Sequence, residues 1–295
     1  MLAALLFLAG PPVALDPLPP GTHARRLVVD GRERTYLLHV PKALDRTRRA
    51  PLVLALHGAG MTGAMMMGFC GLNAKAQAEG FVVAYPDGRG LVWNAGGLKG
   101  EFARRKPDDV RFLSRLIDEV SGLVRIDESR VYATGMSNGG MMCYRLGDEL
   151  SHRLAAVAPV AGTMAIPRAA PKRALPLLHL HCRGDRIVPY DRPERSPLTR
   201  VASFRSAPAS AEAWAVATGC EKEAKTSILS PQDGSRTRIV RQEWAGGKGG
   251  VVLISIDGGG HLWPGRPFPL GLIAPVNALS ANDSIWEFFK KHRLP

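Results

Sequence analysis

Continuous apolar runs recur along the chain, each followed closely by Gly, Pro or Asp. Residues 51–56 and 81–85 are of this kind, which is typical of strands buried on both faces of a sheet. Between such runs we expect helices at residues 67–79 and, behind a cap at Asp108-Asp109, at residues 110–124. Strands that alternate with helices predict an α/β fold, with a mainly parallel, twisted sheet and helices on both faces.

A polar turn at Asp30-Gly31 separates two short runs, residues 26–29 and 35–40, and predicts a hairpin at an antiparallel edge of the sheet. The other expected elements are strands at residues 131–136, 154–160, 175–181, 236–244 and 251–256, helices after Ser137 and at residues 209–218 and 282–291, and a Pro-rich loop or cap segment at residues 191–208. No linker separates two cores, so we expect a single domain over residues 22–295, preceded by a segment of residues 1–21.

The formal net charge of +13 raises the question of an anionic partner. However, the Lys and Arg residues are scattered, are not interleaved with aromatic residues, and accompany no nucleic-acid-binding motif. We therefore expect a solvated basic surface and no nucleic-acid partner. The hydrophobic fraction of 45% is that of a globular protein with a substantial core.

The first ten residues are an apolar run of signal-peptide length, too short to span a bilayer, and a Pro-rich spacer follows at residues 11–20. This pattern favours secretion, to the exterior or the periplasm. No positive region precedes the run, which leaves open whether it is a complete signal peptide. No Cys lies near it, so we expect no lipid or other stable membrane anchor.

The four cysteines, Cys70, Cys143, Cys182 and Cys220, are widely spaced and show no metal-ligand pattern. They permit three disulfide pairings, and the sequence does not choose among them. Cys143, on the helix expected after Ser137, is interpreted as a free buried thiol.

One stretch carries a recognisable catalytic pattern. Gly135-Met136-Ser137-Asn138-Gly139 fits G-x-S-x-G, in which a Ser lies on a sharp turn between a strand and a helix. The flanking glycines allow strand and helix to approach closely, and the helix N-terminus favours developing negative charge. A five-residue match occurs by chance, so the rest of the chain has to supply a base, an acid and an oxyanion hole.

His261 is the best candidate base, because it follows a buried strand inside a Gly-rich loop, and α/β sheets place their chemistry at the ends of strands. His179 and His181 lie on or beside a strand and are expected to be packed. Asp185 follows the strand at residues 175–181 and is the candidate acid, with Asp191 and Asp257 as alternatives.

The chain order Ser137, Asp185, His261 is the order that α/β hydrolases require. The oxyanion hole needs two backbone N–H groups. Asn138, after the nucleophile, supplies one, and the His57-Gly58-Ala59-Gly60 loop supplies the other, from Ala59 or, failing that, Gly60. Each donor contributes about 3–4 kcal/mol to transition-state stabilisation.

With these residues placed, the chain resembles the extracellular polyhydroxybutyrate depolymerase and feruloyl-esterase-like α/β hydrolases, including their actinobacterial lipoprotein branch. The matching segments lie at residues 56–60, 80–88, 93–94, 108–110, 135–141, 184–190 and 261–265. The resemblance implies the α/β-hydrolase fold, the triad Ser137, Asp185 and His261, and ester hydrolysis through an acyl-enzyme. It needs no metal or other cofactor, and we expect none.

The chain departs from the family pattern in three places. Residues 97–100 are Gly-Leu-Lys-Gly where relatives often carry cysteines, which puts one family disulfide in doubt. Cys182-Arg183 replaces the usual Gly-Thr of the acid loop, placing a thiol and a cation near Asp185. No polymer-binding module is present in the sequence. Trp93, Met136 and Trp263 are candidates to line the substrate pocket.

The leading hypothesis is a secreted serine esterase acting on polyhydroxyalkanoate (hydroxybutyrate) polyester or oligomers. The alternative is a feruloyl or acetyl-xylan esterase acting on plant cell-wall esters. A peptidase of the same fold is disfavoured because the sequence shows no gating domain, and a non-catalytic basic binding protein is disfavoured because all three triad residues are present.

Overall fold

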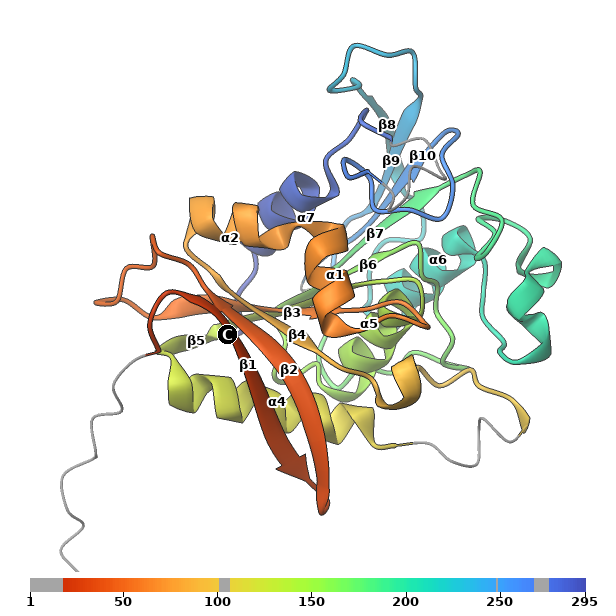
Figure 1. The fold of residues 1–295 in the computed structure, drawn as a ribbon. Helices are drawn as coiled ribbons and strands as arrows, with labels where there is room; N and C mark the ends of the chain where they lie inside the picture. Colours follow the sequence, from red (N-terminus) through yellow and green to blue (C-terminus); the bar gives the residue numbers. More distant parts are fainter. Residues whose placement is uncertain (1–17, 101–106, 248, 268–275) are drawn as a thin grey trace, which may run out of the picture.

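The computed structural model describes residues 18–100, 107–247, 249–267 and 276–295. The apolar run at the N-terminus lies outside these ranges. One ten-stranded sheet dominates, in the order β1-β2-β4-β3-β5-β6-β7-β10-β9-β8 (Figure 1). The strands are β1 (Gly21–Val29), β2 (Arg32–Val40), β3 (Ala50–Leu56), β4 (Val82–Pro86), β5 (Ile126–Met136), β6 (Ala156–Val160), β7 (Leu177–Cys182), β8 (Lys225–Leu229), β9 (Ile239–Trp244) and β10 (Val251–Ile256).

The six central strands, from β4 to β10, all pair in parallel. Antiparallel strands close both ends of the sheet: β1 and β2 beside β4, and β9 and β8 beside β10. This arrangement confirms the α/β-hydrolase fold, with the N-terminal hairpin at an antiparallel edge. Because the central strands are parallel, their carboxyl ends meet at one edge of the sheet, where the segments that follow β3, β5, β7 and β10 all begin.

Helices cover both faces of the sheet (Figure 1). They are α1 (Gly63–Cys70), α2 (Leu72–Glu79), α4 (Asp109–Leu123), α5 (Asn138–Glu149), α6 (Ala207–Ala217) and α7 (Ala281–Phe289). Side chains of α4, α5 and α6 belong to one buried cluster, and those of α1, α2 and α7 to another. Successive residues of β3 alternate between the two clusters, Leu54 in the first and Ala55 in the second, which explains its uninterrupted apolar sequence.

Two local predictions differ from the structure, and one strand was not predicted. The single helix expected at residues 67–79 is two helices, because Gly71 has a φ of 62° that ends α1 and precedes α2. The expected loop at residues 191–208 contains two short 3₁₀ helices, η2 (Pro193–Arg195) and η3 (Pro197–Arg200). β8 was not predicted, because its residues are mostly exposed and polar at an edge of the sheet.

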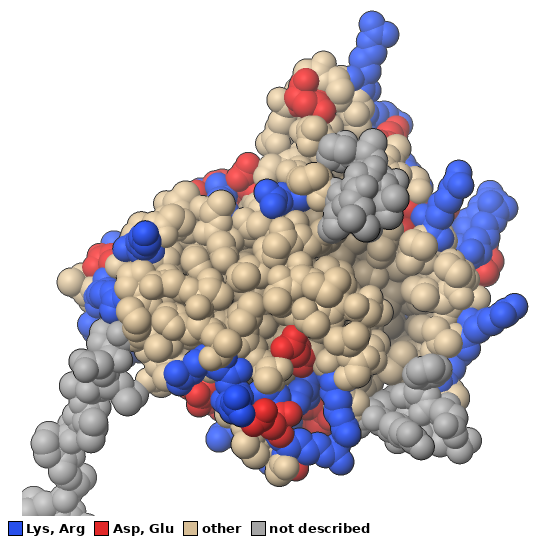
Figure 2. Space-filling model, viewed as in Figure 1, with Lys and Arg blue, Asp and Glu red and all other residues tan. Residues whose placement is uncertain are grey.

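Surface charge of both signs is interspersed on the face shown in Figure 2, where Lys and Arg lie mainly at the periphery among Asp and Glu. A broad neutral area occupies the middle of that face (Figure 2). In the ranges that the structure describes, no helix is long and apolar enough to cross a bilayer.

Candidate active site

Ser137 lies on the sharp turn between β5 and α5. Its φ of 55° and ψ of −119° place a non-glycine residue in a strained region of backbone space. Two hydrogen bonds hold the turn: the Ser137 N–H donates to the Val160 carbonyl (2.9 Å), and the Ser137 carbonyl accepts from the Met141 N–H (2.9 Å). The structure therefore has the strained strand-to-helix turn that the G-x-S-x-G pattern predicts.

The glycines of the pattern are explained by backbone contacts. A Cβ on Gly139 would lie 2.3 Å from the Leu56 carbonyl oxygen and 2.6 Å from that of His57. A Cβ on Gly135 would lie 2.6 Å from the carbonyl carbon of Gly139. The first turn of α5 thus packs directly on the end of β3, and this contact brings the Ser137 turn beside the loop that follows β3.

Asp185 and His261 are brought together across a sequence separation of 76 residues, with His261 Nδ1 2.7 Å from Asp185 Oδ2. The other carboxylate oxygen accepts the N–H groups of Ile187 (2.8 Å) and Val188 (2.9 Å). Burial raises the pKa of Asp185, but hydrogen bonds from His181 and His261 outweigh burial and hold that pKa well below its usual range. Asp185 is therefore a carboxylate, and His261 Nδ1 carries the proton of their hydrogen bond.

The two alternative acids lie elsewhere. Asp257 pairs with Arg183, with the guanidinium Nε 3.1 Å from a carboxylate oxygen, and Asp191 is exposed. Arg183 also lies over the Tyr190 ring, 4.5 Å from its centroid. The cation expected near the acid is thus directed to a different carboxylate. Within the described ranges, no hydrogen bond joins Ser137 to His261, a contact that often tightens only when substrate binds.

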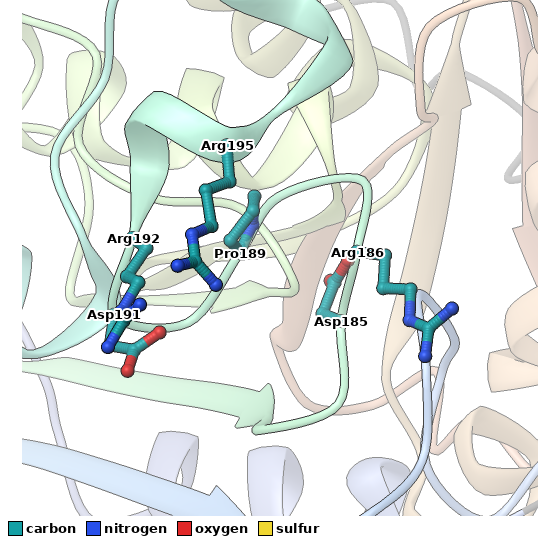
Figure 3. A pocket seen from close by; sticks show the side chains of 6 residues that line it. All are labelled: Asp185, Arg186, Pro189, Asp191, Arg192 and Arg195. Atoms are coloured by element: carbon teal, nitrogen blue, oxygen red, sulfur yellow. The ribbon is translucent and has the colours of Figure 1, made fainter.

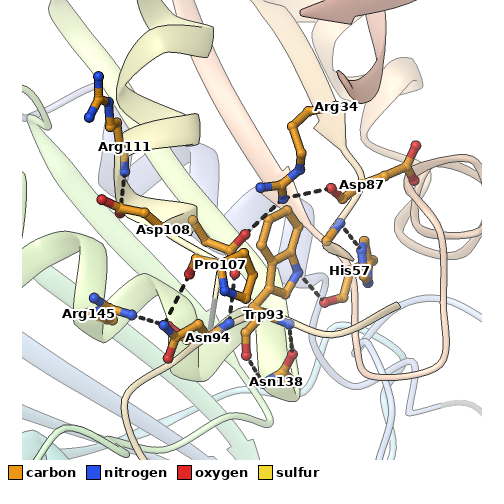
Figure 4. A network of polar contacts seen from close by, with 12 residues as sticks. Arg34, His57, Asp87, Trp93, Asn94, Pro107, Asp108, Arg111, Asn138 and Arg145 are labelled. Atoms are coloured by element: carbon orange, nitrogen blue, oxygen red, sulfur yellow. Dashed lines mark hydrogen bonds and ion pairs between the residues drawn. The ribbon is translucent and has the colours of Figure 1, made fainter. Parts of the chain in front are cut away.

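The oxyanion loop after β3 is organised by the buried His57 (Figure 4). Its Nε2 accepts the Gly88 N–H (2.8 Å), so its proton resides on Nδ1, which donates to the Gly58 carbonyl (2.8 Å). Burial lowers the pKa of His57, which keeps the ring neutral and this tautomer in place. The Gly60 N–H donates to the Leu91 carbonyl (2.8 Å). The Ala59 N–H forms no hydrogen bond with any residue that the structure describes. Of the two candidates, Ala59 is the one with a free donor.

Trp93 connects the oxyanion loop to the helix after Ser137. Its indole N–H donates to the His57 carbonyl (3.0 Å), and its backbone N–H donates to Asn138 Oδ1 (2.6 Å). The Asn138 side-chain amide returns a hydrogen bond to the Trp93 carbonyl (3.2 Å). Asn138 is the first residue of α5, so its own N–H has no partner within the helix. Trp93 therefore holds both expected oxyanion donors in fixed relative positions.

A buried ion pair anchors Trp93 in turn (Figure 4). Asp109 Oδ1 accepts from Arg34 (2.8 Å), and Asp109 Oδ2 accepts the N–H of Asn94 (2.8 Å). The Asn94 carbonyl accepts from Arg145 of α5 (2.6 Å). Neither Arg34 nor Asp109 was singled out as part of the site from sequence. The expected helix cap is confirmed for Asp108, whose side chain accepts the Arg111 N–H (2.9 Å).

The three proposed pocket residues are all buried in the structure. Trp93 and Trp263 have no exposed surface, and Met136 is 3% exposed. The Trp263 indole donates to Asn282 Oδ1 (2.9 Å), in the first turn of α7. The two indoles are thus packed and hydrogen-bonded inside the protein, and they present no face to a substrate in this structure.

A hollow of about 520 Å³ adjoins Asp185 (Figure 3). Its other lining residues are Arg186, Pro189, Asp191, Arg192 and Arg195. The hollow is therefore mainly basic, and it lies between the loop after β7 and the segment of η2.

All four cysteines are free thiols. Burial raises the pKa of Cys143 well above its usual value, and burial together with the charge of Asp185 raises that of Cys182 to about 12, so both thiols stay protonated. Cys143 is buried and unpaired, as predicted. In the described part of the chain, no group of three or more His, Cys, Asp and Glu residues is arranged to hold a metal ion.

Residues 43–197 match the protein family described as phospholipase/carboxylesterase. NocK of Nocardia uniformis subsp. tsuyamanensis, described as an esterase, is 36% identical over 261 residues, which are 84% of this chain and 76% of NocK. Feruloyl esterase C of Emericella nidulans is 27% identical over 267 residues, which are 88% of this chain and 84% of that enzyme.

Among solved structures, the acetyl xylan esterase from Aspergillus awamori superimposes with a TM-score of 0.63 at 15% identity, over 91% of this chain and 99% of that one, a likeness of fold. None of these proteins is named as a polyhydroxyalkanoate depolymerase. The match covers the segment from the oxyanion loop through Ser137 to Asp185. The chain therefore belongs to the phospholipase/carboxylesterase family of α/β hydrolases, and its activity is that of a serine carboxylesterase.

Proposed function

We propose that Ser137, His261 and Asp185 form the catalytic triad of an esterase that cleaves feruloyl or related esters of plant cell-wall polysaccharides. The observation that carries the triad is the 2.7 Å contact between Asp185 and His261, at the same edge of the sheet as the Ser137 turn. The similarity to feruloyl esterase C, over most of both chains, supports the substrate class.

The geometry implies the following steps. With its proton on Nδ1, His261 offers the Nε2 lone pair to Ser137, whose oxygen attacks the ester carbonyl carbon as its proton moves to Nε2. The resulting oxyanion accepts hydrogen bonds from the N–H groups of Ala59 and Asn138. Collapse of this intermediate releases the alcohol, protonated by His261, and leaves an acyl-enzyme. Water then attacks the acyl group, and the same base and oxyanion donors serve the second half of the reaction.

The triad is tested with Ser137→Ala, assayed on p-nitrophenyl acetate and methyl ferulate. We expect a loss of about 10⁶ in kcat. Ser235→Ala is the matched control, because Ser235 is an exposed serine in the segment between β8 and β9, and it should keep wild-type activity. A Ser137→Ala variant that retains activity on both esters would show that another residue is the nucleophile.

The substrate class is tested by comparing methyl ferulate, acetylated xylan and 3-hydroxybutyrate oligomers with the wild-type protein. We expect the highest kcat/KM on methyl ferulate. If only the 3-hydroxybutyrate oligomers are hydrolysed, the cell-wall proposal is wrong and the polyhydroxyalkanoate hypothesis replaces it.

We further propose that the protein is exported, since its first ten residues have the length and apolar character of a signal-peptide core. Fractionation of cells that express the full chain tests this proposal, because it requires the esterase activity to accumulate outside the cytoplasm. Activity confined to the cytoplasmic fraction would contradict it.

A further inference from the structure

A line of buried polar side chains leads from α5 through β7 to the back of Asp185. The Tyr144 hydroxyl lies 2.8 Å from His179 Nδ1, and His179 Nε2 lies 3.0 Å from His181 Nδ1. His181 Nε2 lies 2.8 Å from the Val188 carbonyl and 3.4 Å from Asp185 Oδ2. Tyr144, His179 and His181 are at most 1% exposed, and none of them has a place in the ester-cleavage steps above.

With both rings neutral, the partners at the two ends allow one arrangement of hydrogens. The Val188 carbonyl only accepts, so His181 Nε2 carries a proton and its Nδ1 accepts. His179 Nε2 must then donate to His181, and His179 Nδ1 accepts the Tyr144 hydroxyl proton. Burial raises the pKa of Tyr144 and lowers that of His179, which agrees with a protonated phenol and a neutral imidazole. The hydrogen bonds therefore all run in one direction along the line and end at the Val188 carbonyl, with the same His181 N–H group 3.4 Å from Asp185 Oδ2.

We propose that Tyr144, His179 and His181 form a positioning chain, which fixes the His181 Nε2–H group, hydrogen-bonded to the Val188 carbonyl, 3.4 Å behind Asp185 while His261 donates to the carboxylate from the front. Hydrogen bonds aligned head to tail polarise one another, so a change at Tyr144 alters the donor at His181. Because β7 carries both imidazoles, the strand supplies the acid and also the group that orients it.

The proposal has a consequence for the pH dependence of the reaction. In the described ranges, the titratable groups that face Asp185 are His181, His261 and the Cys182 thiol, and Arg186 lines the adjoining hollow. Loss of the His181 donor leaves more of the carboxylate charge to act on His261. The acidic limb of the kcat/KM profile then moves to higher pH, a change that a purely structural role in packing does not produce.

Three variants separate the roles: His181→Leu removes the donor, His181→Gln keeps an N–H near the position of Nε2, and Tyr144→Phe removes one atom at the far end. We expect His181→Leu to lower kcat about ten- to a hundredfold on a neutral p-nitrophenyl ester, because the buried Val188 carbonyl loses its donor and the Asp185 carboxylate loses a nearby N–H dipole. The acidic limb of the pH profile should move to higher pH. His181→Gln should restore most of the wild-type kcat and most of the wild-type pH profile. Tyr144→Phe should move the acidic limb to higher pH by a smaller amount than His181→Leu.

Exposed His152 provides the matched control, and His152→Gln should leave kcat and the pH profile unchanged. Thermal melting of each variant identifies loss of folding. A folded Tyr144→Phe or His181→Leu protein with the wild-type pH profile overturns the positioning chain, and so does a His181→Gln protein no better than His181→Leu.

The hollow beside Asp185 carries a second, independent inference. Arg192 and Arg195 reach into it beside Pro189, and Arg186 lies beyond Asp185 on the other side of the loop (Figure 3). Within the described ranges, none of these three exposed guanidinium groups forms an ion pair.

Asp191 is the one exposed carboxylate among the six lining residues, because Asp185 is buried and bound to His261. The volume of about 520 Å³ is that of a ligand site. Unpaired guanidinium groups repel one another, and a planar carboxylate that accepts two N–H groups relieves that repulsion. We infer that the hollow is a subsite for a carboxylate carried by the ester substrate, as on an acidic sugar. This inference rests on the proposed esterase function.

Two matched ester pairs test the subsite. p-Nitrophenyl hemiglutarate against its methyl ester places the anion on the acyl side, and 4-carboxyphenyl butanoate against its methyl ester places it on the alcohol side. In one of the pairs, we expect the Arg192→Gln/Arg195→Gln protein to have an about tenfold lower kcat/KM for the anionic ester, because its KM for that ester rises. The kcat/KM for the neutral ester of the same pair should be unchanged.

Arg200→Gln is the control, because Arg200 is an exposed arginine of η3 outside the lining. Added salt should reduce the wild-type preference for the anionic member. An anionic-to-neutral ratio that is the same in the wild-type and double-variant proteins in both pairs overturns the subsite and leaves the esterase intact. A wild-type protein that hydrolyses no member of either pair overturns the esterase assignment as well.

Discussion

Replacement of Asp109 by Asn tests how the oxyanion donors are held in place. Asp109 has no exposed surface, and each of its two oxygens accepts one hydrogen bond, from Arg34 and from the N–H of Asn94, at 2.8 Å in both cases. An Asn side chain has the same shape but offers one acceptor oxygen. Its amide NH₂ group has to face either a guanidinium or a backbone N–H, so one donor loses its partner.

The expected loss of stability follows from burial. Removing one partner of a buried ion pair costs about 3–5 kcal/mol, because the remaining charge is left uncompensated, and Arg34 is 8% exposed. Burial raises the pKa of Asp109, against the opposing effects of the Asn94 N–H and Arg34, so the pair is held at an electrostatic cost. The Arg34→Met/Asp109→Leu double variant removes both charges and should recover part of the lost stability.

Asp118→Asn is the matched control, because it breaks the ion pair with Arg153 at a carboxylate whose side chain is 44% exposed. Asp118→Asn should lower the free energy of unfolding by less than about 1 kcal/mol. The free energy of unfolding in urea and kcat on p-nitrophenyl acetate are measured for each variant at pH 7.5. Asp109→Asn should lower both the free energy of unfolding and kcat, because Asn94 is adjacent to Trp93, which is hydrogen-bonded to His57 and Asn138. An Asp109→Asn protein with the stability of Asp118→Asn and wild-type kcat would refute the anchoring role.

Three further predictions concern the turn, the acid and the buried imidazoles. Gly139→Ala should destabilise the protein by about 3 kcal/mol in urea, because its Cβ meets a backbone oxygen at the end of β3, whereas Gly68→Ala, at an exposed position of α1, should be neutral or stabilising; equal stabilities would contradict the close contact. Asp185→Asn should lower kcat about 10⁴-fold with little change in KM for p-nitrophenyl acetate, and a near-wild-type kcat would exclude it as the acid. Burial lowers the folded-state pKa values of His57 and His179, so the stability from keeping them neutral is present above about pH 6.5 and is lost as pH falls below that value. The urea midpoint should therefore drop between pH 7.5 and 5, and a constant midpoint over that range would mean that these rings have the same pKa in the folded and unfolded states.

The fold and the order of the candidate catalytic residues could be predicted because both depend on short-range patterns. An apolar run of five to seven residues marks a strand buried on both faces, and parallel strands bring their carboxyl ends to one edge. Ser137, Asp185 and His261 each follow such a run, so the topology alone places them at that edge.

Other features depend on partners that no local pattern names. Arg34 and Asp109 are 75 residues apart, and nothing near either residue predicts the other. An indole in a Gly-rich loop is equally compatible with a substrate pocket and with packing in the interior. Trp93 is packed in the interior because its indole N–H donates to the His57 carbonyl, a partner that the sequence does not indicate. β8 lacks an apolar run because an exposed edge strand buries little, so its pairing with β9 is visible only in the sheet.

The site consists of two halves, each held by its own buried network. On one side, Asp109, Asn94, Trp93 and His57 connect the oxyanion loop to the helix after Ser137. On the other side, strands β7 and β10 pair in parallel and carry the segments of Asp185 and His261. Within the described ranges, no hydrogen bond links Ser137 to His261. An ester carbonyl bound between the oxyanion donors and His261 would contact both halves. Substrate binding would then help to align Ser137 with His261, the contact that proton transfer requires.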